Sequence, residues 1–323
     1  MHNLLDPAIL FFVFGLLAGA LRSNLEIPPA IAKFLSLYLL MALGLKGGFS
    51  LAASGLSPSV AVSLGAAVAL AFIVPTLGYS MLRRHVSGYD AAAVAASYGS
   101  VSAVTFVTAM QYLEGVGMPA GGHMTVAMVL MESPAIIMAV LLANANRQRL
   151  NPQGQGSAGQ FSLGKILHES FTDGAHLLLI GSMIIGYVGG EAGKTMMQPF
   201  AGDLFKGLLA FFLLDMGLMV ARNFSQARKT SAFLLVYAGV GPWVHAAMAL
   251  ALAAVLKMPV ADAAMLMVLS ASASYIVVPA VLRYAIPEAN PSLYFGLSLG
   301  ITFPMNILFG IPMYIHVAQL VLG

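Results

Sequence analysis

Two short serine-rich stretches hold the residues of this chain that are best suited to binding a small anion. The first is GSVS at residues 99–102, and the second is SASAS at residues 270–274. Glycine is conformationally permissive and serine hydroxyls compete for backbone groups, so both stretches continue a helix poorly. A helix that restarts after such a break begins with free N–H groups and the positive end of its dipole. Backbone N–H groups and serine hydroxyls can then hold an anion without a buried lysine or arginine.

Both stretches are expected near the middle of a membrane. Each follows, by about ten residues, an acid that starts an apolar segment, Asp90 in the first case and Asp262 in the second. Ten helical residues rise roughly 15 Å, which is half of a hydrocarbon core of about 30 Å. The two acids are interpreted as caps of their helices at the water interfaces. The alternative is that the small residues only allow close helix packing, as we expect for Gly15 and Gly186.

Two further acids lie deep in apolar runs and point to a cation site. Asp215 lies in LLAFFLLDMGLMV and Glu132 in VAMVLMESPAII. Carboxyl groups inside a membrane are costly, which makes them functional candidates by default. Carboxylates, hydroxyls and amides are hard oxygen ligands that suit a small cation such as Na⁺. The candidate ligands are Asp215, Glu132, Ser133, Thr302 and Asn306. For each acid, a structural hydrogen bond or a role as proton carrier is the alternative.

Composition indicates a helical membrane protein with many spans. Of 323 residues, 59% are hydrophobic and 8% are charged, and the mean hydropathy is +0.89. The net charge of +3 is spread over loops, which argues against a nucleic-acid surface. Without cysteine there is no disulfide or thiolate metal site, and the histidines are too scattered to predict a metal site. Motifs of the Walker A, GxSxG and HExxH types are absent, so we expect no enzyme.

The apolar runs predict an all-α fold with ten transmembrane spans. The first five lie near residues 7–22, 28–50, 57–82, 88–112 and 121–143. The second five lie near 173–191, 199–221, 230–256, 259–283 and 291–319. The predicted domains are a first repeat at 1–143, a polar linker at 144–172 and a second repeat at 173–323.

The two halves repeat each other at matched positions. Asp90 pairs with Asp262, Ser102 with Ser274, and MALGL at 41–45 resembles LDMGL at 214–218. Because five spans is an odd number, the second half must enter from the opposite side, which makes an inverted repeat whose two broken helices cross at the midplane. Basic residues gather in the loops on one side of such a topology, which places the linker in the cytoplasm and both termini outside. These loops hold Arg22, Arg83, Arg84, Arg147, Arg149, Lys165, Arg222, Arg228, Lys229 and Arg283, against Lys46, Lys194 and Lys257 on the other side.

YGSVSAVTF at 98–106, LSASASYIVVPA at 269–280 and the LLDMGL run give the chain a resemblance, over essentially its whole length, to the sodium-dependent bicarbonate transporter family of the SbtA type. The resemblance implies a homotrimer whose core domain moves against a gate domain like an elevator. It also implies Na⁺-coupled bicarbonate uptake across the plasma membrane and a PII-like regulatory partner at the cytoplasmic face. The anion site that it implies comprises Gly99, Ser100, Ser102, Thr105, Ser272, Ser274 and Tyr275.

The sequence therefore predicts a Na⁺-coupled symporter in the lipid bilayer that imports bicarbonate, with Na⁺ as the coupling ion. Spans 3–5 and 8–10 are expected to form the moving core, and spans 1, 2, 6 and 7 the scaffold. One alternative is a Na⁺- or H⁺-coupled transporter of another small anion or carboxylate. A second alternative is an intramembrane enzyme that uses Asp215 and Glu132 as an acid pair. A third is a passive anion channel.

Overall fold

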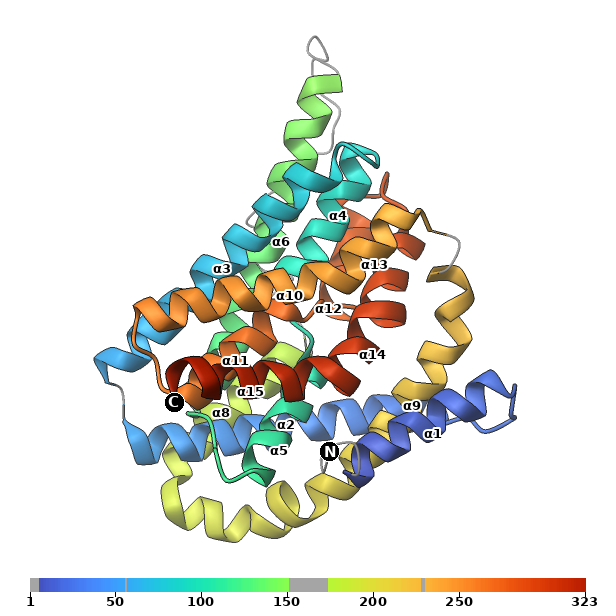
Figure 1. Ribbon diagram of the computed structural model, residues 1–323. Helices are drawn as coiled ribbons and strands as arrows, with labels where there is room; N and C mark the ends of the chain where they lie inside the picture. The colour runs from blue at the N-terminus through green and yellow to red at the C-terminus, as the bar shows by residue number, and fades with distance from the viewer. Residues whose placement is uncertain (1–5, 56, 151–173, 228–229) are drawn as a thin grey trace.

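The computed structural model describes residues 6–55, 57–150, 174–227 and 230–323, which fold into helices joined by short connections (Figure 1). No strand occurs among these residues. Within them, seven helical stretches are long and apolar enough to cross a membrane. One of these, Leu177–Phe224, covers both α8 and α9, while α1 and α11 are shorter apolar helices. The chain is thus an all-helical membrane protein, and the count of ten spans stays a prediction.

The helices begin and end within a few residues of the predicted spans. The first half contains α1 (Pro7–Ala20), α2 (Pro29–Ser54), α3 (Pro58–Leu82), α4 (Gly88–Gly99), α5 (Ala103–Gly115) and α6 (His123–Leu150). The second half contains α8 (Gly174–Met197), α9 (Leu204–Ala227), α10 (Ala232–Val255), α11 (Val260–Ala271) and α12 (Val277–Ala285). The second half ends with α13 (Pro291–Leu297) and α15 (Ile311–Leu322). Its short or π-helical elements are η2 (Gln198–Asp203), η3 (Ser298–Thr302), α14 (Phe303–Met305) and η4 (Asn306–Gly310).

Several helices start at a polar residue followed by proline. Asp6, Ser57 and Asn290 each accept a hydrogen bond from a backbone N–H in the first turn of α1, α3 and α13. Proline follows each of them, where its missing N–H costs no helical bond. At the other end, α6 continues to Leu150, inside the predicted linker. Residues 151–173 of that linker lie outside the described residues.

Four helices, α1, α2, α8 and α9, form a part of the molecule that we call the glycine unit. Helix α1 packs along α9 and α2 packs along α8, in the lower part of Figure 1. Gly15 and Gly217 face each other where α1 meets α9, and a Cβ on Gly15 would lie 3.1 Å from Gly217 Cα. A Cβ on Gly44 or Gly186 would lie 2.5 Å from a backbone oxygen of the facing helix. Glycine is therefore required for these helices to approach so closely.

The remaining helices, α3 to α6 and α10 to α15, form the serine unit, which holds both serine stretches. Helices α3, α4 and α6 pack together, and α11 packs against both α10 and α15. Most of this unit occupies the upper part of Figure 1, while α5 reaches down toward α2. The helices predicted as moving core and as scaffold thus correspond to the serine unit and the glycine unit.

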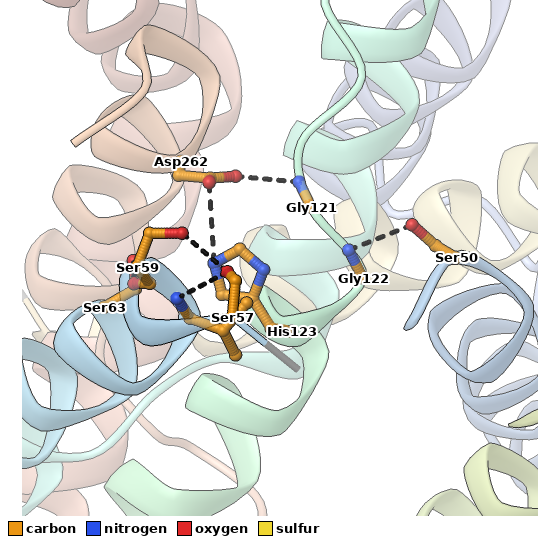
Figure 2. A network of polar contacts seen from close by, with 9 residues as sticks. Ser50, Ser57, Ser59, Ser63, Gly121, Gly122, His123 and Asp262 are labelled. Carbon is orange, nitrogen blue, oxygen red and sulfur yellow. Dashed lines mark hydrogen bonds and ion pairs between the residues drawn. The ribbon is translucent and has the colours of Figure 1, made fainter. Parts of the chain in front are cut away.

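The two acids at the starts of α4 and α11 bind the connector of the opposite half. Asp90 Oδ1 accepts the Asn290 N–H at 2.7 Å, between α12 and α13. Asp262 Oδ1 accepts the Gly121 N–H at 2.7 Å, between α5 and α6 (Figure 2). The N-cap of α4 is Ser87 and that of α11 is Pro259, so the prediction that Asp90 and Asp262 cap these helices is wrong. Each acid instead ties one half of the chain to the other.

Candidate functional site

The first serine stretch separates α4 from α5. Helix α4 ends at Gly99, whose hydrogen faces the ring of Pro75 in α3, where a Cβ would lie 2.6 Å from that ring. Ser102 precedes α5, and its Oγ accepts the Thr105 N–H at 3.2 Å. Gly99 therefore has a packing role, and Ser102 has the N-cap role typical of serine.

The second serine stretch lies at a longer break between helices. Helix α11 ends at Ala271, within the stretch, and α12 begins at Val277. Ser274 Oγ accepts the Val278 N–H at 3.2 Å. Asn306 Nδ2 donates to the Ala271 carbonyl at 2.8 Å, and Ser272 Oγ donates to the Leu269 carbonyl at 2.8 Å. These side chains satisfy carbonyls that the end of α11 leaves without an intrahelical partner.

The two stretches contact each other directly. The Ser102 N–H donates to Ser272 Oγ at 3.0 Å, and the Ser274 N–H donates to the Ser97 carbonyl at 2.8 Å. The prediction that the two serine stretches meet is therefore confirmed. Because both bonds are buried, the starts of α5 and α12 are held in one fixed arrangement.

A cavity of about 80 Å³ lies against the starts of α5 and α12. One water occupies about 30 Å³ in the liquid, so this space takes two or three waters or an ion of similar size. The serine unit contributes Val101, Ser102, Ala103, Val104, Val107, Met128, Glu132, Ser274, Tyr275, Ile276 and Val277. The glycine unit contributes Ser36, Leu39, Leu40, Leu179 and Phe212. The cavity thus lies at the boundary between the two units.

The walls of this cavity combine groups that attract an anion with a carboxyl group that repels it. The first N–H groups of α5 and α12 have no intrahelical acceptor, and both helix dipoles present their positive ends there. Ser102 and Ser274 add hydroxyls that each accept an N–H in their own helix. The Ser274 proton is therefore available to a ligand, while the Ser102 hydroxyl also interacts with the Tyr275 hydroxyl. Glu132 of α6 is buried and lines the same space. An anion and a charged Glu132 are compatible there only with a cation or proton nearby.

Of the other predicted anion ligands, Tyr275 lines the cavity, whereas Gly99, Ser100, Thr105 and Ser272 are not part of its wall. Ser100 Oγ and Thr105 Oγ1 are buried, and neither makes a hydrogen bond to the described residues. Ser272 reaches the site only through its bond to Ser102. Tyr275 does line the cavity, and its hydroxyl points to Met216 Sδ of α9 at 3.8 Å.

The predicted cation ligands are not all brought together. Thr302 Oγ1 donates to the Ala238 carbonyl at 2.8 Å and receives the Tyr98 hydroxyl at 2.6 Å. Asn306 Oδ1 accepts the Tyr314 hydroxyl at 3.0 Å, so its amide is engaged at both ends. Ser133 is half-buried in α6 next to Glu132. Only Glu132 of this set lines the cavity.

Asp215 lies on α9, one turn beyond the cavity residue Phe212. Its side chain is buried, and it makes no hydrogen bond or ion pair to the part of the chain that the structure describes. Arg222 on the same helix acts on it electrostatically. Asp215 and Glu132 are thus placed on different units, with only Glu132 at the cavity.

Sequence reasoning missed Ser36, which brings a hydroxyl to the cavity from α2. A lone small polar residue in an apolar helix has no distinctive spacing, so no pattern identified it. The bonds of Thr302 and Asn306 were also missed, because Tyr98 lies 204 residues from Thr302 and Tyr314 belongs to no motif.

Comparison with known proteins identifies the family to which the chain belongs. No match was found among curated proteins. The family model of the Na⁺-dependent bicarbonate transporter superfamily matches residues 7–319, and membership of this family indicates a transporter rather than an enzyme. The cavity between the two serine stretches is thus the candidate ion site of a chain that belongs to the Na⁺-dependent bicarbonate transporter superfamily.

Proposed function

We propose that this chain is a Na⁺-coupled symporter that imports bicarbonate across the plasma membrane. The observation that carries this proposal is one cavity that joins two helix starts, two serine hydroxyls and a carboxyl group. The N–H groups of the helix starts and the serine hydroxyls suit an anion with several acceptor oxygens. The volume of the cavity suits a small anion. Family membership supports both ions.

Glu132 gives the coupling a physical reason. At an effective dielectric constant of 20, two like charges 4 Å apart repel by about 4 kcal/mol. A Na⁺ ion between Glu132 and the anion converts this repulsion into two attractions, so each ion raises the affinity for the other. An anion that enters against an inside-negative potential also costs about 2.3 kcal/mol per 100 mV, which a bound Na⁺ cancels. We assign Glu132 as a Na⁺ ligand on this basis, while Asp215, Ser133, Thr302 and Asn306 stay candidates.

The place of the cavity supports an elevator-like movement. Its serine-unit wall carries the anion-binding groups, whereas its glycine-unit wall is mostly apolar. We propose that the serine unit carries the ions across while the glycine unit stays fixed and bears the contacts of a homotrimer. The reciprocal bonds of Asp90 and Asp262 support the inverted repeat. In the orientation proposed from basic residues, the termini lie outside, and a PII-like partner would meet the cytoplasmic face.

The test is uptake of labelled bicarbonate into proteoliposomes with and without an inward Na⁺ gradient. We expect the gradient to accelerate uptake and to be required for accumulation above equilibrium. Equal flux without Na⁺ would show a passive anion channel and contradict the proposal.

A small carboxylate is the second candidate substrate, and the apolar side chains Leu40, Val104 and Phe212 in the wall favour it. Such side chains can accommodate a short alkyl group, which bicarbonate lacks. Competition between labelled bicarbonate and unlabelled formate, acetate or lactate distinguishes the two. Stronger competition by a carboxylate than by bicarbonate itself would assign that carboxylate as the substrate.

A further inference from the structure

One segment of α2 makes polar contacts with the serine unit. Lys46 Nζ donates to Glu114 Oε2 at 3.1 Å and to Oε1 at 3.2 Å. Lys46 lies on α2 and Glu114 lies near the end of α5, so this ion pair joins the glycine unit to the serine unit. The Lys46 ammonium also lies 4.6 Å from the centroid of the Phe205 ring on α9. The lysine is therefore held by its own unit while it reaches across to the other.

A second contact lies one helical turn further along α2. Ser50 Oγ accepts the Gly122 N–H at 3.1 Å, and the adjacent Gly121 N–H goes to Asp262 (Figure 2). A Cβ on Gly122 would lie 2.6 Å from Ser50 Cβ and 2.5 Å from the Gly47 carbonyl oxygen. The connector between α5 and α6 is thus bound to α2 at both of its ends and to α11 in between.

The connector on the opposite face of the serine unit is bound within that unit. There the connector between α12 and α13 is bound through Asn290 to Asp90 and through Glu288 to Arg147 of α6. All of these partners belong to the serine unit itself. The Lys46/Glu114 ion pair, in contrast, joins the two units. The Lys46/Glu114 ion pair and the Ser50/Gly122 bond thus lie on the α2 face, whereas α9 packs against α13 and η3 and receives the Tyr275 hydroxyl at Met216 Sδ.

Water reaches these contacts through a second, larger cavity of about 730 Å³. Lys46, Ser50, Glu114 and Gly122 line it, and the side chains of Lys46 and Glu114 are 23% and 35% exposed. Ion pairs that water can reach contribute little net stability, because the separated charges are well solvated. A contact that must open in every transport cycle needs this property. A buried pair would leave two desolvated charges each time it opened.

We propose that the Lys46/Glu114 and Ser50/Gly122 contacts form a releasable latch. The latch positions the serine unit against α2 in the arrangement described above, and both contacts break when the serine unit moves. This inference rests on the elevator-like movement of the proposed function and identifies which contacts that movement must open. Lys46, Ser50 and Glu114 are thus positioning residues of the cycle rather than ligands of the transported ions.

The chain contains no cysteine, so a pair of introduced cysteines can test the latch without interference. In Ser50→Cys/Gly122→Cys the two Cβ atoms would lie 2.6 Å apart, so the connector must move away from α2 by about 1 Å to reach the Cβ separation of a disulfide, about 3.5–4.5 Å. We expect oxidation to reduce Na⁺-driven bicarbonate uptake at least tenfold and reduction to restore it. Full uptake by a chain whose disulfide is verified by loss of free thiols would overturn the latch.

The matched control is Gly19→Cys/Ala221→Cys. A Cβ on Gly19 would lie 2.6 Å from Ala221 Cβ and 3.3 Å from the nearest backbone atom, and these residues join α1 to α9 within the glycine unit. Oxidation of this variant should leave uptake within twofold of the reduced protein. Absence of Na⁺-driven uptake by the unmodified chain would contradict the proposed function, whereas full uptake by the cross-linked chain contradicts the latch alone.

Charge reversal tests the latch in case Gly122→Cys prevents folding. Lys46→Glu places two carboxyl groups together, and we expect the maximal uptake rate to change at least threefold. Lys46→Glu/Glu114→Lys restores the pair and should return the rate to within twofold of the unmodified chain. Lys194→Glu lines the same cavity but pairs within its own helix, so it should have less than a twofold effect. Failure of the double variant to restore the rate would overturn the latch.

Discussion

The glycine unit and the serine unit are built on opposite principles. In the glycine unit, Gly15, Gly44, Gly186 and Gly217 let the backbones of facing helices touch. In the serine unit, small residues interrupt two helices and leave polar groups at a cavity. The same preference for small residues thus gives rigidity in one unit and a binding site in the other. Small residues within a helix allow tight packing, whereas small residues that interrupt a helix leave polar groups free to form a binding site.

The largest effect is expected from overfilling the glycine unit. A Cβ on Gly217 would approach Gly15 Cα at 3.0 Å and would contact the Phe12 carbonyl oxygen even more closely. Gly217→Ala should therefore destabilise the protein by about 1 to 3 kcal/mol, as overpacked substitutions do, and lower the Tm in detergent. The control is Gly207→Ala on the same helix, where a Cβ would meet no atom within 4 Å. That change should leave Tm unchanged or raise it, since alanine favours a helix over glycine.

The second effect concerns Glu132, the charged group of the serine unit at the cavity. Glu132→Gln keeps the size of the side chain but loses most of its attraction for a cation. We expect the Na⁺ concentration for half-maximal uptake to rise at least tenfold. Asp215→Asn, which changes a buried acid of the glycine unit outside the cavity, should raise it less than threefold. A larger effect at Asp215, measured in the same Na⁺ titration, would move the cation site to α9.

The third effect concerns the hydroxyls at the cavity. Ser102→Ala or Ser274→Ala removes a hydrogen bond to a charged ligand, worth about 1.5 to 3 kcal/mol, and should raise the KM for the anion tenfold or more. Ser298→Ala is the control, because Ser298 is fully buried in the same unit and its hydroxyl makes no hydrogen bond to the described residues. Equal KM values for all three variants would assign the cavity serines a packing role.

Features of the two units that depend on neighbouring residues could be predicted from the sequence. Contacts between residues far apart in the sequence mostly could not. The positions of the helix interruptions follow from local residue types, as at Ser100 and Ser272, and the repeat predicted that the two stretches meet. The bonds of Thr302 and Asn306 could not be predicted, because their partners are distant or lack a motif. The wall contributed by Ser36 and Phe212 depends on how the two units pack, which no local pattern describes.

The smallest effect is expected at the end of α6. Arg147 donates to both Glu288 carboxylate oxygens, at 2.9 and 2.8 Å, and holds the pKa of Glu288 below its usual value. A carboxyl group with a lowered pKa in the folded state contributes stability above its unfolded pKa and loses that contribution as pH falls through the folded value. Glu288→Gln should therefore lower Tm slightly at pH 7. The difference should shrink below about pH 4.3, and a difference that persists there would mean that the contact acts through packing.

The reciprocal bonds of Asp90 and Asp262 have a consequence for how the chain is made. The partners of Asp90 and Ser102 are Asn290 and Ser272, which leave the ribosome long after the first half has reached the membrane. Until then, the start of α5 carries backbone groups that lipid cannot satisfy. The first half is therefore incompletely hydrogen-bonded while the second is synthesised, and contacts between such distant residues form slowly. Biogenesis thus depends on the synthesis of Ser272 and Asn290 before the first half of the chain is degraded or forms incorrect contacts.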